Sequence, residues 1–326
     1  MSKKNTHKET VVTPEKVYDF CSKKRLILGV VIAVLVVCLA GAIIRGIHLA
    51  IEFKGGTLIT YTYQGDINTN DVASNVKDII GTPVVVRTGE SLDSGGKQIT
   101  ISFTSDEGLT ADRQTELTSS LREKFPDNDL VIYDSNDVSP SSGREFLLKC
   151  FIAVLFAAFI VIIYIAIRFK NIGGWSAGVC SIFALCLDIL VAFTTTIVCG
   201  FNIDSNIVAV ILTILGYSIN NTIVIYDRIR ENRKLMPKAS LNELINVSCT
   251  QSLTRSVRTS ITTIGTMLIV TIVVKVTGYD SLLSFSVPLM MGLISGTFSS
   301  LFVAPVTWSW LKNRKAKKAK EAKSSK

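Results

Sequence analysis

Long apolar runs alternate with polar segments along the chain, and their lengths predict six membrane-spanning helices. A helix rises about 1.5 Å per residue, so roughly 20 apolar residues cross a hydrocarbon layer of about 30 Å. Runs of this length occupy residues 26–47, 146–167, 172–201, 207–226, 257–276 and 282–311. The pattern therefore predicts an α-helical polytopic membrane protein with six transmembrane helices.

A long polar segment, residues 50–145, separates the first two runs and shows shorter periodicities. Strand-like alternation or β-branched composition occurs at 57–64, 83–88, 98–104 and 130–133, and helical spacing occurs at 68–80 and 110–125. Asn68 and Thr110 stand where helix N-caps are expected. The order β-α-β-β-α-β predicts an α+β domain of ferredoxin-like, split βαβ type, an architecture that by itself indicates no function.

The distribution of charge predicts on which side of the membrane each segment lies. Lys and Arg concentrate in residues 1–25, in the loop 227–255 and in the tail 312–326, whereas residues 50–145 carry sixteen acids against eight bases. Basic residues collect on the cytoplasmic side, so both termini are expected there and residues 50–145 outside. The net charge of +9 therefore indicates membrane topology and contact with anionic membrane lipids rather than nucleic acid.

These boundaries divide the chain into a basic N-terminus (1–25), a first span (26–49), an extracytoplasmic domain (50–145), a five-span bundle (146–311) and a basic tail (312–326). The first span contains Ala40, Gly41 and Ala42, which are similar to a signal-peptide cleavage site. Cleavage there would leave five spans and place the termini on opposite sides. We therefore expect the first span to be retained.

Polar residues inside the predicted spans are the candidate functional residues. Asp188 stands in the middle of the third span, and Asn220 and Asn221 lie within the fourth. A central Asp disfavours insertion by about 2.5–3.5 kcal/mol, so these side chains are expected to face other helices or a hydrated cavity. Asp188 is open to two interpretations, a protonatable interior site or a structural hydrogen bond between spans.

Two arginines, Arg255 and Arg258, begin the fifth span, and a stripe of threonines continues from them. Helix geometry places Asn221 about 9 Å from Asp227, the residue at the membrane boundary. The arginines are expected to approach this depth. Snorkelling of Arg255 to the cytoplasmic interface is the structural alternative.

The last span combines small residues with two prolines. Gly292, Gly296 and Ser300 form a small-xxx-small stripe, which predicts the close approach of a neighbouring helix. Pro288 and Pro305 lie toward opposite ends of the span and are expected to kink or end the helix.

Enzymatic function has little support in the sequence. The chain contains two histidines, His7 in the polar N-terminal tail and His48 at the outer membrane edge, so we expect neither a His-based catalytic triad nor a zinc cluster. The glycine pair Gly55 and Gly56 lacks the context of a nucleotide-binding P-loop. We therefore expect no enzymatic activity, no cofactor and no metal.

One motif within the fourth span is characteristic of a known family. GYSINNTIVIYDRIREN contains Gly216, Asn220, Asp227 and Arg228. The stretch resembles the fourth span of SecF members of the SecD/SecF family, in which GYS, the first Asn and the DRIREN ending are typical.

Other motifs agree in order along the chain. IEFKGGT, which holds Gly55 and Gly56, is similar to the DF-x-GGT element of the same family, with Glu52 where Asp is usual. NVSCTQSL followed by Arg255, and GTFSS in the last span, are similar as well. The resemblance thus extends from Ile51 to the last span.

The resemblance implies a six-span half of the RND superfamily architecture. Such a half pairs with SecD and helps the SecYEG channel export unfolded secretory polypeptides across the bacterial plasma membrane with the proton motive force. An external insert between spans one and two of a lone six-span unit independently indicates a partner half. Two other functions fit the pattern: an RND-type exporter half for lipids or small molecules, and a proton-independent structural scaffold of the translocase.

One departure from the family concerns energy coupling. The resemblance implies that Arg255 is functionally important and that position 221 is typically Asp in the proton-responsive site. Asn221 forms hydrogen bonds but does not titrate. Either Asp188 or a carboxylate of the SecD partner must then bind the proton, or coupling is weak or absent. The loss of the carboxylate at position 221 favours the partner.

Overall fold

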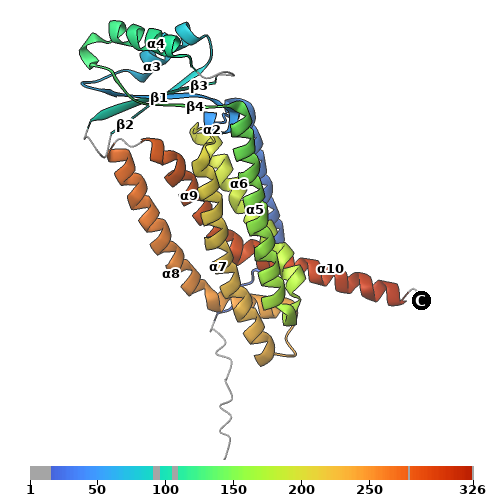
Figure 1. Ribbon diagram of the computed structural model, residues 1–326. Coiled ribbons are helices and arrows are strands. Elements are labelled where there is room, and N and C mark those ends of the chain that lie inside the picture. The colour runs from blue at the N-terminus through green and yellow to red at the C-terminus, as the bar shows by residue number, and fades with distance from the viewer. Residues whose placement is uncertain (1–15, 91–95, 105–108, 278–279, 325–326) are drawn as a thin grey trace, which may run out of the picture.

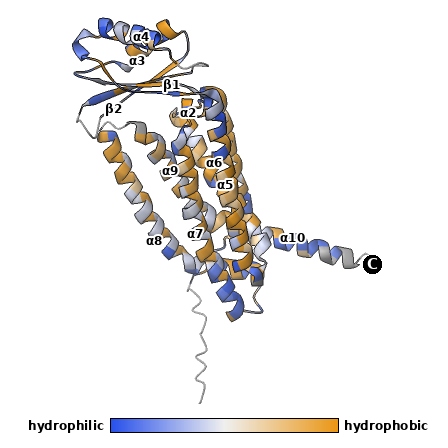
Figure 2. Ribbon diagram, viewed as in Figure 1, coloured by the Kyte–Doolittle hydropathy of each residue, from blue (hydrophilic) through white to orange (hydrophobic). Residues whose placement is uncertain are grey.

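The computed structural model describes residues 16–90, 96–104, 109–277 and 280–324, which form a helical bundle with a small domain at one end (Figure 1). His7 lies outside the described residues. Six helical stretches of the described chain are long and apolar enough to cross a membrane. Apolar residues cover the length of the bundle, and hydrophilic residues gather on the small domain and at the opposite helix ends (Figure 2). The predicted polytopic membrane fold is confirmed.

The bundle is built around two central helices. Its long helices are α1 (Lys24–Arg45), α5 (Pro140–Arg168), α6 (Gly174–Cys199), α7 (Ser205–Leu235), α8 (Leu241–Val276) and α9 (Asp280–Phe298). Helix α6 packs against α1, α5 and α9, and α9 also packs against α7 and α8. Short 3-10 turns precede α1 (Cys21–Lys23) and α6 (Lys170–Ile172).

The segment 227–255, expected as a cytoplasmic loop, is helical except for the turn at 236–240. The charged residues there do not interrupt the helices, and Arg230 pairs with Asp227 on the same helix at 2.9 Å. Ser240 caps α8 by accepting a hydrogen bond from the Glu243 amide at 3.2 Å. The two helices therefore extend beyond the apolar run from which each was predicted.

The last span changes helix type along its length and runs from Leu282 to Lys318, beyond its predicted end at 311. Helix α9 passes into a π-helix (Ser299–Val303) and then into α10 (Ala304–Ser324), whose first turns pack in the bundle and whose C-terminal part projects away from it (Figure 1). Pro305 has no backbone donor and the π-helix disrupts the regular hydrogen-bond pattern, which accounts for the change of direction. Pro288 lies inside α9 without ending it. The described part of the basic tail is helical.

The small domain contains a four-stranded antiparallel sheet in the order β2-β3-β1-β4. Its elements are α2 (Ile51–Lys54), β1 (Gly56–Tyr63), α3 (Thr69–Ile80), β2 (Val84–Glu90), β3 (Lys97–Phe103), α4 (Ala111–Lys124), a 3-10 turn (Pro126–Asn128) and β4 (Val131–Val138). Strand β3 lies between β1 and β2, which is the split βαβ arrangement of a ferredoxin-like domain. Helices α3 and α4 cover the face of the sheet that points away from the bundle (Figure 1).

The two faces of this sheet differ in polarity. Ile59, Ile99 and Ile101 are fully buried beneath the two helices. The opposite face points toward the bundle and carries polar side chains such as Thr60 and Thr100, whose hydroxyls lie 3.3 Å apart. The domain therefore presents a polar surface to the ends of the membrane helices.

A glycine pair connects this domain to the bundle. Gly55 and Gly56 have φ of +86° and +145°, and a Cβ on Gly55 would lie 2.6 Å from the Pro140 backbone at the start of α5. A Cβ on Gly56 would lie 2.3 Å from the Phe103 carbonyl oxygen. Only glycine fits this turn, because both the backbone conformation and the close approach exclude a side chain.

Candidate functional site

Asp188 lies fully buried in α6, and its carboxylate accepts hydrogen bonds from three serine hydroxyls. Ser218 of α7 and Ser299 of the π-helix each donate to Oδ2 at 2.7 Å. Ser295 of α9 donates to Oδ1 at 2.7 Å. These three residues, called the serine cage below, replace water at both carboxylate oxygens and tie α6 to α7 and α9.

The chemistry of the serine cage suits a group that gains and loses a proton. Within the described residues, no Lys, Arg or His side chain forms an ion pair with Asp188. A hydroxyl both donates and accepts hydrogen bonds, so a serine that donates to a carboxylate also accepts from a protonated acid after its O–H rotates. The cage can therefore hydrogen-bond to Asp188 in both of its protonation states.

The small-residue stripe predicted for the last span lies beside this site. A Cβ on Gly296 would lie 3.2 Å from the Ser218 Cβ and 3.6 Å from Asp188 Oδ2. A Cβ on Gly292 would lie 2.1 Å from the Ile214 Cδ1 atom of α7. The helix that packs closely against the stripe is therefore α7. Ser300, at the end of the stripe, is buried.

The two adjacent amides of α7 have different surroundings. Asn221 is 3% exposed, and its Nδ2 has no acceptor within the described residues. Asn220 is exposed on the outer side of the helix. No hydrogen bond among the described residues joins Asn221 to Asp188 or to an arginine.

Arg255 and Arg258 are exposed on α8, and the threonine stripe beyond them is exposed at Thr259, Thr262 and Thr266 and half-buried at Thr263. The threonine hydroxyls donate to carbonyls of their own helix, as Thr263 does to the Thr259 oxygen at 3.0 Å. Arg255 lines a pocket at the basic end of the bundle. The predicted approach of these arginines to Asn221 is therefore absent from the contacts of the described residues.

The DRIREN ending of α7 holds three helix ends together. Asp227 lies 3.1 Å from Arg168 of α5, and Arg228 Nε donates to Gln251 Oε1 of α8 at 2.7 Å. Asn232, fully buried, donates to Gln251 and to Ser248 of α8 at 2.7 and 2.8 Å. A Cβ on Gly216, in the same motif, would meet no atom within 4 Å.

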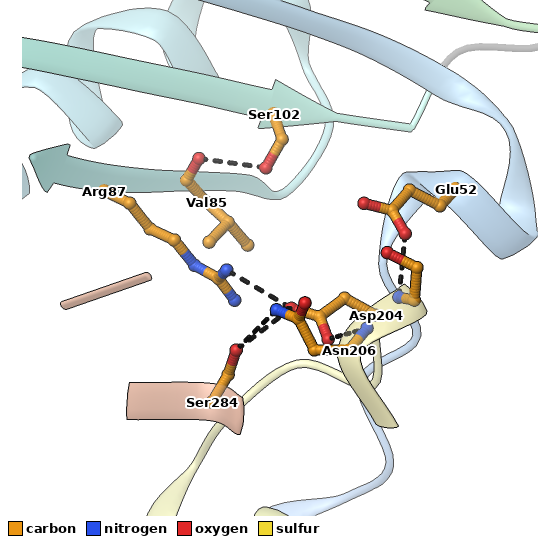
Figure 3. Close-up of polar contacts among 8 residues, drawn as sticks. Glu52, Val85, Arg87, Ser102, Asp204, Asn206 and Ser284 are labelled. Atoms are coloured by element: carbon orange, nitrogen blue, oxygen red, sulfur yellow. Dashed lines mark hydrogen bonds and ion pairs between the residues drawn. The ribbon is translucent and has the colours of Figure 1, made fainter. Parts of the chain in front are cut away.

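A second polar cluster lies where the small domain meets the bundle (Figure 3). Arg87 of β2 points toward Asp204, with 3.8 Å between Nη1 and Oδ2. Asp204 caps α7 by accepting from the Asn206 amide at 3.1 Å, and its Oδ2 accepts from Ser284 of α9 at 3.2 Å. Glu52 of α2 accepts from the Ser205 amide at 2.8 Å. We call these contacts the domain joint.

Of the residues in the domain joint, only Asp204 could be recognised from the local sequence. Burial raises the pKa of Asp204, and the nearby Arg87 partly opposes that shift. An Asp directly before an apolar run is a helix-start signature, which identifies Asp204 as a cap. Its pairing with Arg87 follows from tertiary packing between distant segments and has no local pattern.

The serine cage and the domain joint share two helices. Helix α7 contributes Ser218 to the cage and begins at the cap Asp204. Helix α9 contributes Ser295 to the cage and Ser284 to the joint. A movement of either helix relative to α6 would therefore act on both sites.

Comparison with known proteins identifies two matching family models. Residues 117–314 match the model described as Protein export membrane protein SecD/SecF, C-terminal. Residues 42–67, which contain the glycine pair, match the SecD/SecF GG Motif. Together the two models cover parts of the external domain and the five-span bundle.

Individual proteins agree with the family models. Protein translocase subunit SecF of Petrotoga mobilis is 30% identical over 301 residues, covering 91% of this chain and 97% of that protein. SecDF of Bacillus subtilis is 31% identical over 94% of this chain and 40% of its own length. The crystal structure of SecDF from Thermus thermophilus, titled a translocon-associated membrane protein, matches with TM-score 0.75 and 26% identity over 92% of this chain and 39% of that chain. This chain thus spans about two fifths of the SecDF chains it matches.

Proposed function

The chain belongs to the SecD/SecF family of protein-export membrane proteins, and we propose that it is the SecF-type subunit of the Sec protein translocase. In this role it associates with SecD and promotes the export of unfolded secretory polypeptides through SecYEG. The proton gradient across the bacterial plasma membrane supplies the energy. The subunit performs no enzymatic step.

The observation that carries the energetic part of this proposal is the serine cage. Asp188 is fully buried, accepts three hydroxyl hydrogen bonds and has no ion-pair partner within the described residues. A proton that crosses 100 mV releases roughly 2.3 kcal/mol, enough to bias a conformational equilibrium about fifty-fold. In this proposal, protonation of Asp188 couples the free energy of the proton gradient to the conformation of this chain.

The domain joint supplies the route from the interior to the external domain. Protonation of Asp188 reverses the direction of at least one hydrogen bond to the serine cage. Helix α7 carries that change toward Asp204, and α9 carries it toward Ser284. Asp204 pairs with Arg87 of the domain, and Ser284 donates a hydrogen bond to Asp204. The external domain, which contacts the exported polypeptide in this proposal, then changes its position on the bundle.

Asn221 leaves this chain without the carboxylate that the family resemblance implies at that position. Its Nδ2 has no acceptor among the described residues, so the amide does not complete a hydrogen-bonded network there. In our proposal Asp188 binds the proton in this chain, and a SecD carboxylate is the alternative site.

The exposed face of α8 supports association with SecD. Thr259, Thr262 and Thr266 are exposed along one side of this helix, and Thr263 beside them is half-buried, in a helix long and apolar enough to cross the membrane. Polar side chains in a span face protein or water rather than lipid. SecD is the partner we propose to cover this face.

The proposed orientation places both termini in the cytoplasm of a multi-pass plasma-membrane protein. Ser119 is exposed on α4 of the small domain, and Ser240 is exposed between α7 and α8. In a cysteine-free background, Ser119→Cys on intact cells is expected to react with an impermeant thiol reagent, and Ser240→Cys is not. Labelling of position 240 from outside would overturn the orientation.

Co-purification tests the assembly directly. The tagged full chain, extracted from membranes in a mild detergent, is expected to retain SecD and, at lower yield, SecYEG. Membrane vesicles lacking the chain are expected to lose only the part of protein export that a protonophore abolishes. A chain that purifies with neither partner and leaves export unchanged would contradict the proposed function.

A further inference from the structure

A basic pocket of about 690 Å³ lies between the ends of α5, α7 and α8. Its cationic lining residues are Arg168, Arg228, Arg230, Lys234 and Arg255. The volume falls within the range of roughly 300–1,000 Å³ that holds whole small molecules, and exceeds what a single ion requires. The pocket lies at the end of the bundle that the charge distribution assigns to the cytoplasm.

The positive charge of this basic pocket is only partly neutralised. Asp227 pairs with Arg168 and Arg230 at 3.1 and 2.9 Å, and the second acid of the lining, Glu231, pairs with Arg228. Lys234 and Arg255 form no ion pair and no side-chain hydrogen bond within the described residues. Five cations therefore face two acids, and the two unpaired cations are available to an anion.

An apolar stripe leads along α5 toward the same pocket. Phe156, Ile160 and Tyr164 are 63%, 50% and 48% exposed, and they follow one another at helical i, i+4 spacing. The next position in this series is Arg168, which lines the basic pocket. A molecule with an apolar chain and an anionic head would contact the stripe and the pocket at once.

We propose that the basic pocket binds the phosphate headgroup of an anionic phospholipid from the cytoplasmic leaflet, with acyl chains along the α5 stripe. Guanidinium groups bind phosphate oxygens through two parallel hydrogen bonds, and basic pockets between membrane helices bind anionic headgroups on the cytoplasmic side. The proposal relies on the orientation of the bundle and is independent of the role in protein export.

The test measures lipid binding to the purified full chain in a neutral detergent. Native mass spectrometry titrates phosphatidylglycerol against phosphatidylcholine with the same acyl chains, which separates headgroup charge from chain contacts. Glycerol 3-phosphate and inorganic phosphate serve as competitors without acyl chains. The three comparisons distinguish a lipid headgroup from a soluble phosphate compound.

The pocket variant combines Lys234→Gln with Arg255→Gln. Neither Lys234 nor Arg255 pairs with an acid of the pocket, so these substitutions leave the ion pairs of Asp227 and Glu231 in place. The matched control combines Lys238→Gln with Lys318→Gln, two exposed lysines outside the pocket lining. A charge-retaining variant, Lys234→Arg with Arg255→Lys, keeps the test valid if the glutamine variant folds poorly.

Phosphatidylglycerol is expected to bind at least about tenfold more tightly than phosphatidylcholine. The glutamine pocket variant is expected to bind phosphatidylglycerol about thirty-fold more weakly, because each cation near an anionic headgroup raises the affinity by roughly a factor of five. The control and charge-retaining variants are expected to remain within about twofold of the unmodified chain. Unchanged binding in the pocket variant, equal binding of the two lipids, or equally effective competition by glycerol 3-phosphate would each overturn the proposal.

Discussion

Arg87 of the external sheet lies 3.8 Å from Asp204, the residue that caps α7. The Asp204 side chain is 9% exposed and that of Arg87 is 33% exposed. The same helix carries Ser218, which donates to the interior carboxylate Asp188. The ion pair therefore lies at one end of a helix whose middle contacts the proposed proton site.

Removal of this ion pair is expected to loosen the domain joint with little loss of global stability. A partly exposed pair contributes about 0.2–1 kcal/mol, so Arg87→Gln should change the melting temperature only slightly. Hydrogen exchange of the Ser205 and Asn206 amides should accelerate severalfold, since the cap Asp204 loses a partner. Arg113→Gln, on exposed α4, is the control and should leave that exchange unchanged. Equal exchange in both variants would refute a joint held by Arg87.

The raised pKa of Asp204 predicts a defined pH dependence. Because burial raises this pKa above the unfolded value of about 3.9, the folded chain binds the proton more tightly than the unfolded chain. The contribution of Asp204 to stability is therefore complete below pH 3.9 and declines as pH rises through the raised folded pKa. Arg87 opposes this shift and Glu52 adds to it.

Asp204→Asn should remove that decline. The melting temperature of the variant, measured in detergent from pH 4 upward, should fall less steeply with pH than that of the unmodified chain. Parallel curves for the two proteins would show that Asp204 titrates with the same pKa in the folded and unfolded states.

The glycine stripe of α9 is expected to be intolerant of large side chains. Gly296→Leu would place atoms against Ser218 and Asp188, and overpacking of a tight interface costs about 1–3 kcal/mol. Gly216→Leu is the matched control, because a Cβ there would meet nothing within 4 Å. Thermal unfolding of the purified chain should show a loss for the first variant only. Equal melting temperatures for Gly296→Leu and Gly216→Leu would show that the stripe has no packing role.

Two buried asparagines on α7 provide a paired test of hydrogen bonding. Asn221→Leu removes an amide whose Nδ2 has no described acceptor, and should maintain or raise the melting temperature. Asn232→Leu breaks hydrogen bonds to Ser248 and Gln251 and should lower stability by about 1–3 kcal/mol. Comparable losses in both variants would mean that the Asn221 amide has a partner outside the described contacts.

The spans and the small domain were predictable because their signals are local. The spans are visible as apolar runs long enough to cross a membrane. In the small domain, the alternation of Ile99, Ile101 and Phe103 indicates directly which side chains are buried in the core. Strand β4 was predicted too short, at 130–133. Its later residues, such as Asp134 and Ser135, are exposed and pair with β1 through the backbone, so they show no apolar alternation.

The candidate site was only partly predictable. Asp188 stands out as a carboxylate inside an apolar run, but the serines that bind it lie 30, 107 and 111 residues away. Serine is common in membrane helices, and no periodicity distinguishes a cage member from a serine that bonds its own helix. The partners of Asp188 and of Arg87 arise from the packing of α6, α7 and α9.

The serine cage also predicts which variants of Asp188 fold. Asparagine has nearly the same shape as aspartic acid and keeps an acceptor and a donor for the serine hydroxyls, but it does not titrate. Asp188→Asn should therefore retain the melting temperature and the association with SecD. Asp188→Leu leaves three hydroxyls without their acceptor and should destabilise the chain by several kcal/mol.

Proton binding by Asp188 is tested most directly by gradient-dependent protein export in membrane vesicles that contain Asp188→Asn. The variant is expected to lose the part of export that a protonophore abolishes, while export without a gradient and the amount of assembled SecD stay unchanged. Asn221→Asp, assayed in parallel, should keep gradient-dependent export. Full gradient-dependent export by Asp188→Asn would contradict proton binding by Asp188 and place the proton-binding group on SecD.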